Sequence, residues 1–103
     1  MGYMLARIQL RYGAEALNTF NEALAALLPA FEKQGLRLVG AYANSIGTLN
    51  EVWDIWEVRD ANHIMESRRG FRTLPGVAEH TKRLAEVIVT EQLHYVEKLP
   101  YST

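Results

Sequence analysis

The segment from residue 45 to residue 58 constrains the fold more than any other part of the chain. It reads SIGTLNEVWDIWEV, a glycine-containing turn followed by a run rich in β-branched and aromatic side chains, which favours a strand entered through a hairpin. Side chains alternate along a strand, so Trp53 and Trp56 point to opposite faces of the sheet. A strand with one face in water rarely carries a large apolar ring on each side. We therefore expect helices over one face and a second cover over the other.

The first half of the chain supplies a strand, a helix and a second strand. Residues 4–12 alternate between apolar and polar side chains, and residues 36–44 read as the second strand. Between them, residues 14–34 carry apolar side chains at the spacing of three and four that makes one helical stripe, and Gly35 follows where a left-handed cap belongs. Pro29 is expected to bend this helix or split its last turn.

The second half predicts a broken helical crossover and a last strand. Asp60 is a good N-cap for a helix through about Arg69, and the segment 70–76 breaks the pattern. A further helix over 77–86 leads into residues 87–96, whose Val, Ile, Thr and Tyr content favours a fourth strand.

This order predicts an α+β fold of the ferredoxin-like βαββαβ type with an antiparallel sheet, formed as one domain by residues 1–103. Right-handed crossovers place the helices on one face only. The apolar side of the first strand faces the helices, and the side bearing Leu5, Arg7 and Gln9 is left open. A second copy of the chain is the simplest cover for that open face, which gives a homodimer with two sheets face to face, a dimeric α+β barrel.

Bulk properties exclude several classes of function. The formal charge of −1, with acidic and basic residues interspersed, gives no electrostatic footprint for nucleic acid. The sequence contains no apolar run long enough for a membrane helix and no signal-peptide pattern, so a cytoplasmic protein is expected. It also contains no cysteine, and its histidines and acids lack metal-ligand spacing, so neither a metal site nor a cofactor is predicted.

The candidate site follows from side-chain parity. Asp54 and Trp56 share one face of the third strand, and that face is expected to line the space between the two sheets. A small ligand is expected to bind there, at the dimer barrel, or in a cavity between sheet and helices. The predicted catalytic residues are Asp54, His94 and Arg7. The predicted ligand contacts are Gln9, Tyr42, Asn44, Asn50 and Trp56.

Asp54 has two interpretations. In an apolar cavity its charged form is disfavoured, so its pKa rises and the carboxyl suits general acid or base work. Alternatively, Asp54 pairs with Arg7 or Arg11, or meets solvent at a cavity mouth, without a functional role. His94 reads either as a proton shuttle or as a partly exposed structural residue.

The basic cluster Arg68, Arg69 and Arg72 also has two interpretations. It could bind an anion that enters the cavity, or it is a solvated face beside the end of a helix, where the helix dipole stabilises positive charge.

The run GTLNEVWDIW resembles the G-x-L-N-x-V-x-H-L-W signature of the NIPSNAP family, preceded by Gly40 and Tyr42 and followed by a closing LPYS similar to the family's P-x-P-F-S tail. The resemblance covers nearly the whole chain and implies a dimeric α+β barrel of the small bacterial type, with Asn50 and Trp56 carried over. Asp54 stands where the family has histidine, and the family's E-L-R-x-Y strand is absent. The roles proposed for animal members, in vesicle transport and mitochondrial biology, imply little about the activity of this chain.

Three functions from different classes remain open. The first is an enzyme that acts on a small organic molecule without a cofactor, since related dimeric barrels include monooxygenases, cyclases, dehydratases and isomerases. The second is a non-catalytic ligand-binding or accessory protein. The third is an interaction module of a larger complex. Fold alone does not choose between them.

Overall fold

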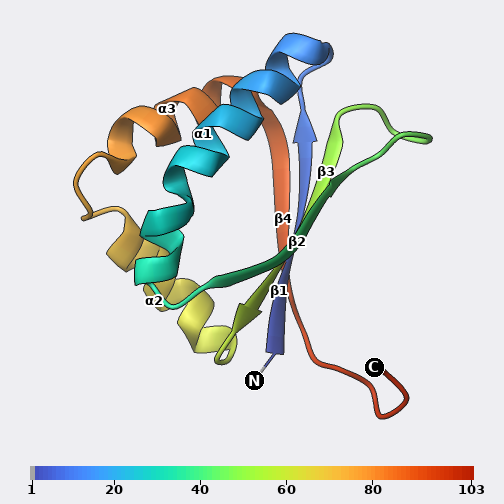
Figure 1. Cartoon of the computed structure of the whole chain (residues 1–103), viewed down its shortest axis with the longest axis vertical. Coiled ribbons are helices and arrows are strands. Elements are labelled where there is room, and N and C mark those ends of the chain that lie inside the picture. The colour runs from blue at the N-terminus through green and yellow to red at the C-terminus, as the bar shows by residue number, and fades with distance from the viewer. Residues whose placement is uncertain (1) are drawn as a thin grey trace.

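The computed structural model describes residues 2–103, which form a four-stranded sheet with three helices packed on one side (Figure 1). In chain order the elements are β1 (Gly2–Leu10), α1 (Ala14–Lys33), β2 (Arg37–Ala43), β3 (Glu51–Val58), α2 (Ala61–Phe71), α3 (Val77–Val87) and β4 (Ile88–Val96).

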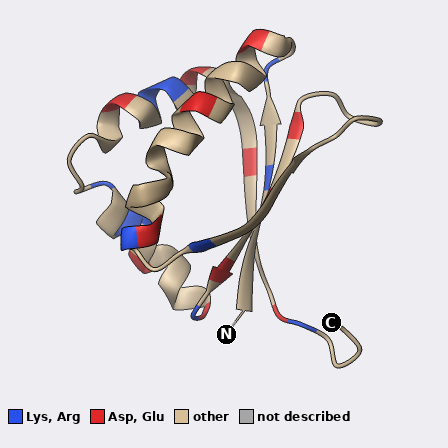
Figure 2. Cartoon of the chain, viewed as in Figure 1, with Lys and Arg blue, Asp and Glu red and all other residues tan. Residues whose placement is uncertain are grey.

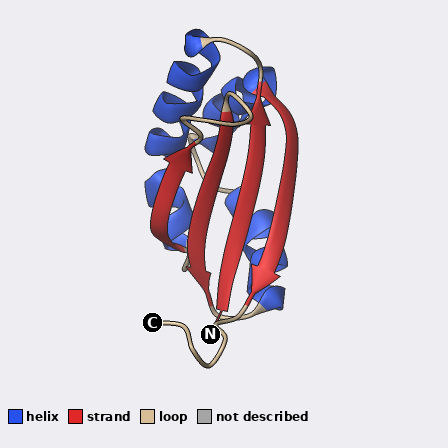
Figure 3. Cartoon of the chain, turned by 90° about the vertical axis from the view of Figure 1, so that its right-hand side faces the viewer, coloured by secondary structure: helices blue, strands red, loops and turns tan. Residues whose placement is uncertain are grey.

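The strands lie in the order β2-β3-β1-β4, and every neighbouring pair is antiparallel. This is the predicted ferredoxin-like βαββαβ arrangement, with the second crossover made of two helices, and the α+β class is confirmed. Viewed from the side opposite the helices, the four strands present an uncovered face, and all helices lie behind them (Figure 3). One face of the sheet is therefore closed by the chain itself and the other is open.

The end of α1 shows how local sequence fixes a boundary. Gly35 has φ 82°, and the backbone N–H of Leu36 donates to the carbonyl of Phe31 at 3.2 Å, which is the Schellman arrangement expected for a left-handed glycine after a helix. Pro29 lies inside α1, which continues to Lys33. The predicted split of the last turn at Pro29 is therefore wrong.

The second crossover begins at the predicted cap and continues slightly beyond the predicted end. The Asp60 carboxylate accepts from the backbone N–H of His63 at 2.9 Å. α2 then extends through Gly70 to Phe71, because Phe71 stacks on Phe31 of α1 with ring centroids 4.7 Å apart. The terminal amide of the Gln34 side chain lies directly over Gly70, so a side chain at position 70 would require that amide to move.

Two apolar clusters fill the layer between sheet and helices. One gathers Ile8, Leu10 and Phe20 at one end of the sheet, and the other gathers Met4 and Trp56 at the other end. None of the helices formed by residues 2–103 combines the length and the hydropathy needed to cross a lipid bilayer.

Candidate functional site

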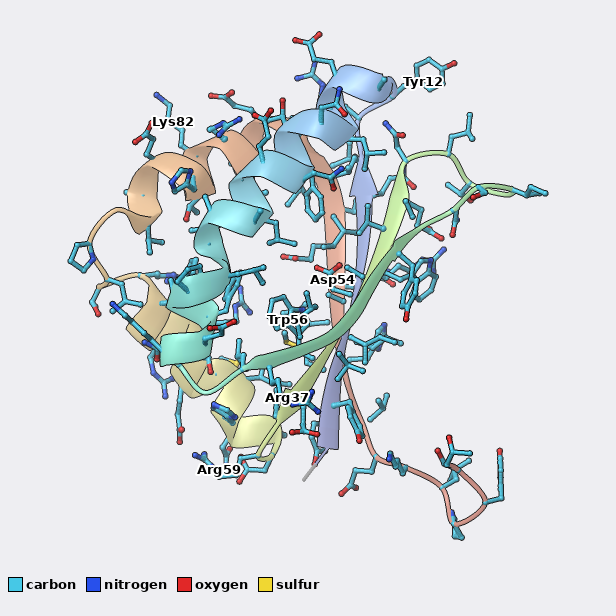
Figure 4. The ribbon with its side chains drawn as sticks, in the orientation of Figure 1. Tyr12, Arg37, Asp54, Trp56, Arg59 and Lys82 are labelled. Carbon is cyan, nitrogen blue, oxygen red and sulfur yellow. The ribbon has the colours of Figure 1, made fainter. Side chains whose placement is uncertain are left out.

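The register between β1 and β3 decides which way the candidate residues point. Ala6 lies opposite Asp54 and Met4 lies opposite Trp56. Directly opposed residues of an antiparallel pair project to the same face, and Ala6 and Met4 face the helices. Asp54 and Trp56 accordingly point into the space between sheet and helices (Figure 4).

The expected convergence of Asp54 and Trp56 with Arg7 and Gln9 is therefore wrong. Arg7 lies opposite Trp53 and projects from the open face. Its Nε donates to the Glu51 carboxylate at 2.9 Å, and its guanidinium lies 5.3 Å from the centroid of the Trp53 ring.

Gln9, Tyr42 and His94 also belong to the open face. Gln9 donates to the carbonyl of Leu49 at 2.9 Å. Tyr42 lies opposite Trp53, and His94 lies opposite Leu5. These side chains share a face with Arg7 and are separated from Asp54 by the thickness of the sheet.

Asn44 and Asn50 hold the β2–β3 connection in place. The Asn44 amide donates to the Thr48 carbonyl at 3.1 Å and to Glu51 at 3.0 Å. Asn50 has φ 57°, and its side-chain amide donates to the carbonyls of Arg11 at 2.6 Å and Gly13 at 2.7 Å. These bonds hold the start of β3 against the loop before α1. The structure therefore shows Asn50 in a role that stabilises the fold.

A cavity of about 520 Å³ lies between the sheet and the helices, and Asp54 and Trp56 are part of its lining. This volume is in the range of small-molecule sites. Its floor is the helix-facing side of β1 and β3, and its back wall is α1. The exposed members of the lining lie on α2, α3 and β4, so the cavity opens to solvent between these elements. The main lining residues are Met4, Ala6, Ile8, Phe20, Leu24, Phe31, Asp54, Trp56, Ser67, Arg68, Phe71, Arg72, Thr81, Leu84, Glu91 and Leu93.

Asp54 is the polar group at the floor of this cavity. Its residue is only 2% exposed, and its Oδ1 atom is buried without a hydrogen-bond partner among the described residues. Burial raises the pKa of Asp54 to about 6, and the like charge of Glu91 adds to the rise. The alternative in which Asp54 pairs with Arg7 or Arg11 is not found. Arg7 binds Glu51, and Arg11 donates to the Glu86 carbonyl at 3.0 Å.

Glu91, Arg68 and Arg72 lie at the mouth. Glu91 lies opposite Ile8 on β4 and therefore shares the helix-facing side of the sheet with Asp54. Partial burial raises the pKa of Glu91, and the nearby charge of Arg68 opposes that rise. Arg72 joins Arg68 in the lining, one helical turn further along the chain.

The remaining polar groups of the lining are occupied. The Ser67 hydroxyl donates to the His63 carbonyl at 2.7 Å, and the Thr81 hydroxyl donates to the Val77 carbonyl at 2.9 Å. Asp54 is consequently the buried polar group of the cavity that is left for a ligand.

Aromatic rings make one wall of the cavity rigid. Trp56 meets the edge of Phe31 with centroids 5.0 Å apart, and Phe31 stacks on Phe71. Among residues 2–103, no group of three or more histidine or acidic side chains is placed to hold a metal ion.

Glu91 is the site residue that sequence reasoning missed. The sequence did contain a signal. Glu91, Leu93 and Tyr95 are two positions apart and therefore share one face of the last strand, so an acid lies on the apolar face of that strand. The same kind of signal existed on β3. Glu51 and Glu57 flank Trp53, which marks that face as the more polar one and Asp54 as the exception on the apolar face.

Solved structures show that the fold is shared. An uncharacterised NIPSNAP domain protein from Burkholderia xenovorans is 19% identical with a TM-score of 0.81, and the match covers 100% of this chain and 99% of that one. A NIPSNAP family protein of unknown function from Agrobacterium tumefaciens is 18% identical with a TM-score of 0.85, covering 99% and 91%. A Bordetella bronchiseptica protein, named provisionally as an antibiotic biosynthesis monooxygenase, is 21% identical with a TM-score of 0.68, covering 96% and 99%.

At these identities the shared fold carries no information on activity. No curated protein matches the sequence. The sequence profile of the NIPSNAP family matches residues 4–103, and the chain therefore belongs to the NIPSNAP family.

Proposed function

We propose that this chain binds a small, mainly apolar organic molecule in the cavity between sheet and helices and exchanges a proton with it at Asp54, without a cofactor. One observation carries the proposal: a buried carboxylate oxygen without a partner stands at the floor of a cavity of about 520 Å³. An unsatisfied buried acceptor is unfavourable, and a ligand with an O–H, N–H or acidic C–H group would satisfy it.

The chemistry follows from the protonation state of Asp54. A pKa of about 6 leaves the carboxyl mostly ionised near neutral pH, so it can take a proton from a bound molecule and return it. Such transfer is the elementary step of isomerisation, cyclisation and dehydration, and it needs no oxidant. Trp56 and Phe31 form an apolar wall of the cavity, which suits an apolar ligand body.

A direct test uses β-tetralone, an apolar ketone with acidic protons beside its carbonyl, in deuterated buffer. The protein should accelerate exchange of these protons, as followed by NMR, with a rate that rises through a midpoint near pH 6. Asp54→Asn should abolish the acceleration. Glu57→Gln, which removes a carboxylate from the open face, is the matched control and should retain it.

A non-catalytic binding protein is the second candidate, and one observation favours it. The hydroxyls of Ser67 and Thr81 are committed to helix carbonyls, so neither is free to stabilise a developing oxyanion. Binding of β-tetralone without accelerated exchange would select this alternative.

We further propose that the open sheet face is covered by a second copy of the chain. Leu5, Trp53, Ile55 and Tyr42 form an apolar surface across three strands, and Tyr42 is 60% exposed. The sheet lies bare on this side in Figure 3. Exposed apolar patches of this kind mark interaction surfaces, and a homodimer needs no other partner.

A further inference from the structure

The mouth of the cavity carries positive charge that the fold does not use. Arg68 and Arg72 belong to the lining, and neither takes part in an ion pair among residues 2–103. Arg59, at the other end of the same stretch, is by contrast fully engaged, since it binds both Asp60 and Glu66. The two cavity arginines are the available cations beside the opening.

A purely structural explanation for these arginines is weak. Cations near the end of a helix can donate to its last carbonyls, and this is the ordinary reason for a basic C-terminal turn. In α2 the last turn is closed instead by backbone bonds, from the N–H of Arg72 and Thr73 to the Gly70 carbonyl. The Thr73 hydroxyl also donates to that carbonyl at 2.8 Å. Among residues 2–103, neither the Arg68 nor the Arg72 guanidinium donates a hydrogen bond to this end of the helix.

We infer that the ligand is a carboxylate-bearing molecule, whose acid group binds Arg68 and Arg72 at the mouth while its apolar body reaches Asp54. This inference rests on the proposed function. A guanidinium presents a planar fork of donors that matches a carboxylate, and two of them one turn apart face the same opening.

The charge balance at the mouth favours a single negative charge. At the mouth Arg68 and Arg72 outnumber the single carboxylate, Glu91, so these three side chains carry one net positive charge there, while the charge of Asp54 lies at the floor. Figure 2 shows basic residues near the end of α2, on the side of the molecule away from the open sheet face. A carboxylate bound at the mouth would meet this local positive charge, and a neutral ligand would not.

This arrangement also orients the ligand. Asp54, when ionised, repels a carboxylate from the floor of the cavity. The acid group is therefore kept at the mouth, and the opposite end of the molecule, bearing its proton donor, is directed to the floor. The arginines set the orientation and Asp54 performs the proton exchange.

The test compares a hydroxynaphthoic acid with its methyl ester by calorimetric titration at low and high salt. The two probes share the ring and the hydroxyl and differ in charge and in the methyl group of the ester. The acid should bind at least about tenfold more tightly than the ester at low salt, and added salt should reduce that advantage. In Arg68→Gln/Arg72→Gln the advantage should disappear. Arg69→Gln, which changes a neighbouring arginine outside the lining, is the matched control and should keep it.

Three outcomes would overturn the inference, and they separate it from the proposed function. If the ester binds as tightly as the acid, or more tightly, the ligand is neutral and the arginines are solvated surface, while binding in the cavity stands. If neither probe binds, the inference and small-molecule binding both fail. Retained acid preference in the double variant would place the anion site elsewhere.

Discussion

The pH dependence of stability offers the sharpest test of the environment assigned to Asp54. In the folded chain its pKa is raised from 3.8 to about 6. Between these values the folded state holds more protons than the unfolded state, so the free energy of unfolding falls as pH rises. The contribution is favourable in acid and is lost as pH passes the folded pKa. Asp54→Asn removes this titration.

The magnitude follows from the two pKa values. Their difference of about 2.2 corresponds to about 3 kcal/mol once both states are ionised. By the same linkage the penalty is about 1 kcal/mol at about pH 4.5 and about 3 kcal/mol at about pH 7.5. The asparagine amide has a similar shape, and any cost of burying it does not vary with pH. Relative to the parent, Asp54→Asn should therefore gain about 2 kcal/mol across this interval.

The assay is urea unfolding of the two proteins at several pH values, with the slopes compared to confirm that the same surface is exposed. Asp60→Asn is an informative control of opposite sign. Its carboxylate is bonded to Arg59 and to the backbone N–H of His63, which lowers the pKa of Asp60. The disadvantage of Asp60→Asn should therefore shrink as the pH falls.

A stability difference between Asp54→Asn and the parent that stays flat, or that declines with rising pH, would refute the reasoning. Asp54 would then have a hydrogen-bond partner or free access to water, and the argument that its carboxyl acts as a general acid or base would fail. Glu91→Gln adds a check, because removal of the like charge should lower the midpoint of Asp54 titration measured by carboxyl NMR.

Three further predictions concern the hairpin, the cavity and the open face. Asn50→Ala should destabilise the fold by about 2–3 kcal/mol in urea unfolding, because it removes two bonds and places alanine at φ 57°, and Asn50→Gly should cost less. Ala6→Leu places a larger side chain in the cavity, so it should lower the free energy of unfolding by less than the roughly 1–3 kcal/mol typical of an overpacked core. The same side chain should block β-tetralone binding measured by calorimetry. Ile55→Lys should convert a dimer to a monomer in sedimentation experiments, whereas Met65→Lys on α2 should not; a monomeric parent would contradict the proposed dimer.

The elements and their order could be predicted from local patterns in the sequence. Alternation on β1, the apolar stripe of α1, the cap at Asp60 and the turn at Gly35 are local patterns, and each depends on residues a few positions apart. The ferredoxin-like topology follows from that order and from the handedness of the crossovers. The uncovered sheet face follows as well, since the chain has helices for one side only.

The location of the candidate site, by contrast, depends on contacts between distant parts of the chain. The face on which Asp54 emerges depends on the register of β3 against β1, and a slip of one residue would exchange Asp54 with Trp53. That register is set by contacts between segments far apart in the chain, so local pattern could not supply it. The same contacts bring Glu91, Arg68 and Arg72 to one opening. They also place the buried carboxylate of Asp54 at the cavity between the sheet and the helices.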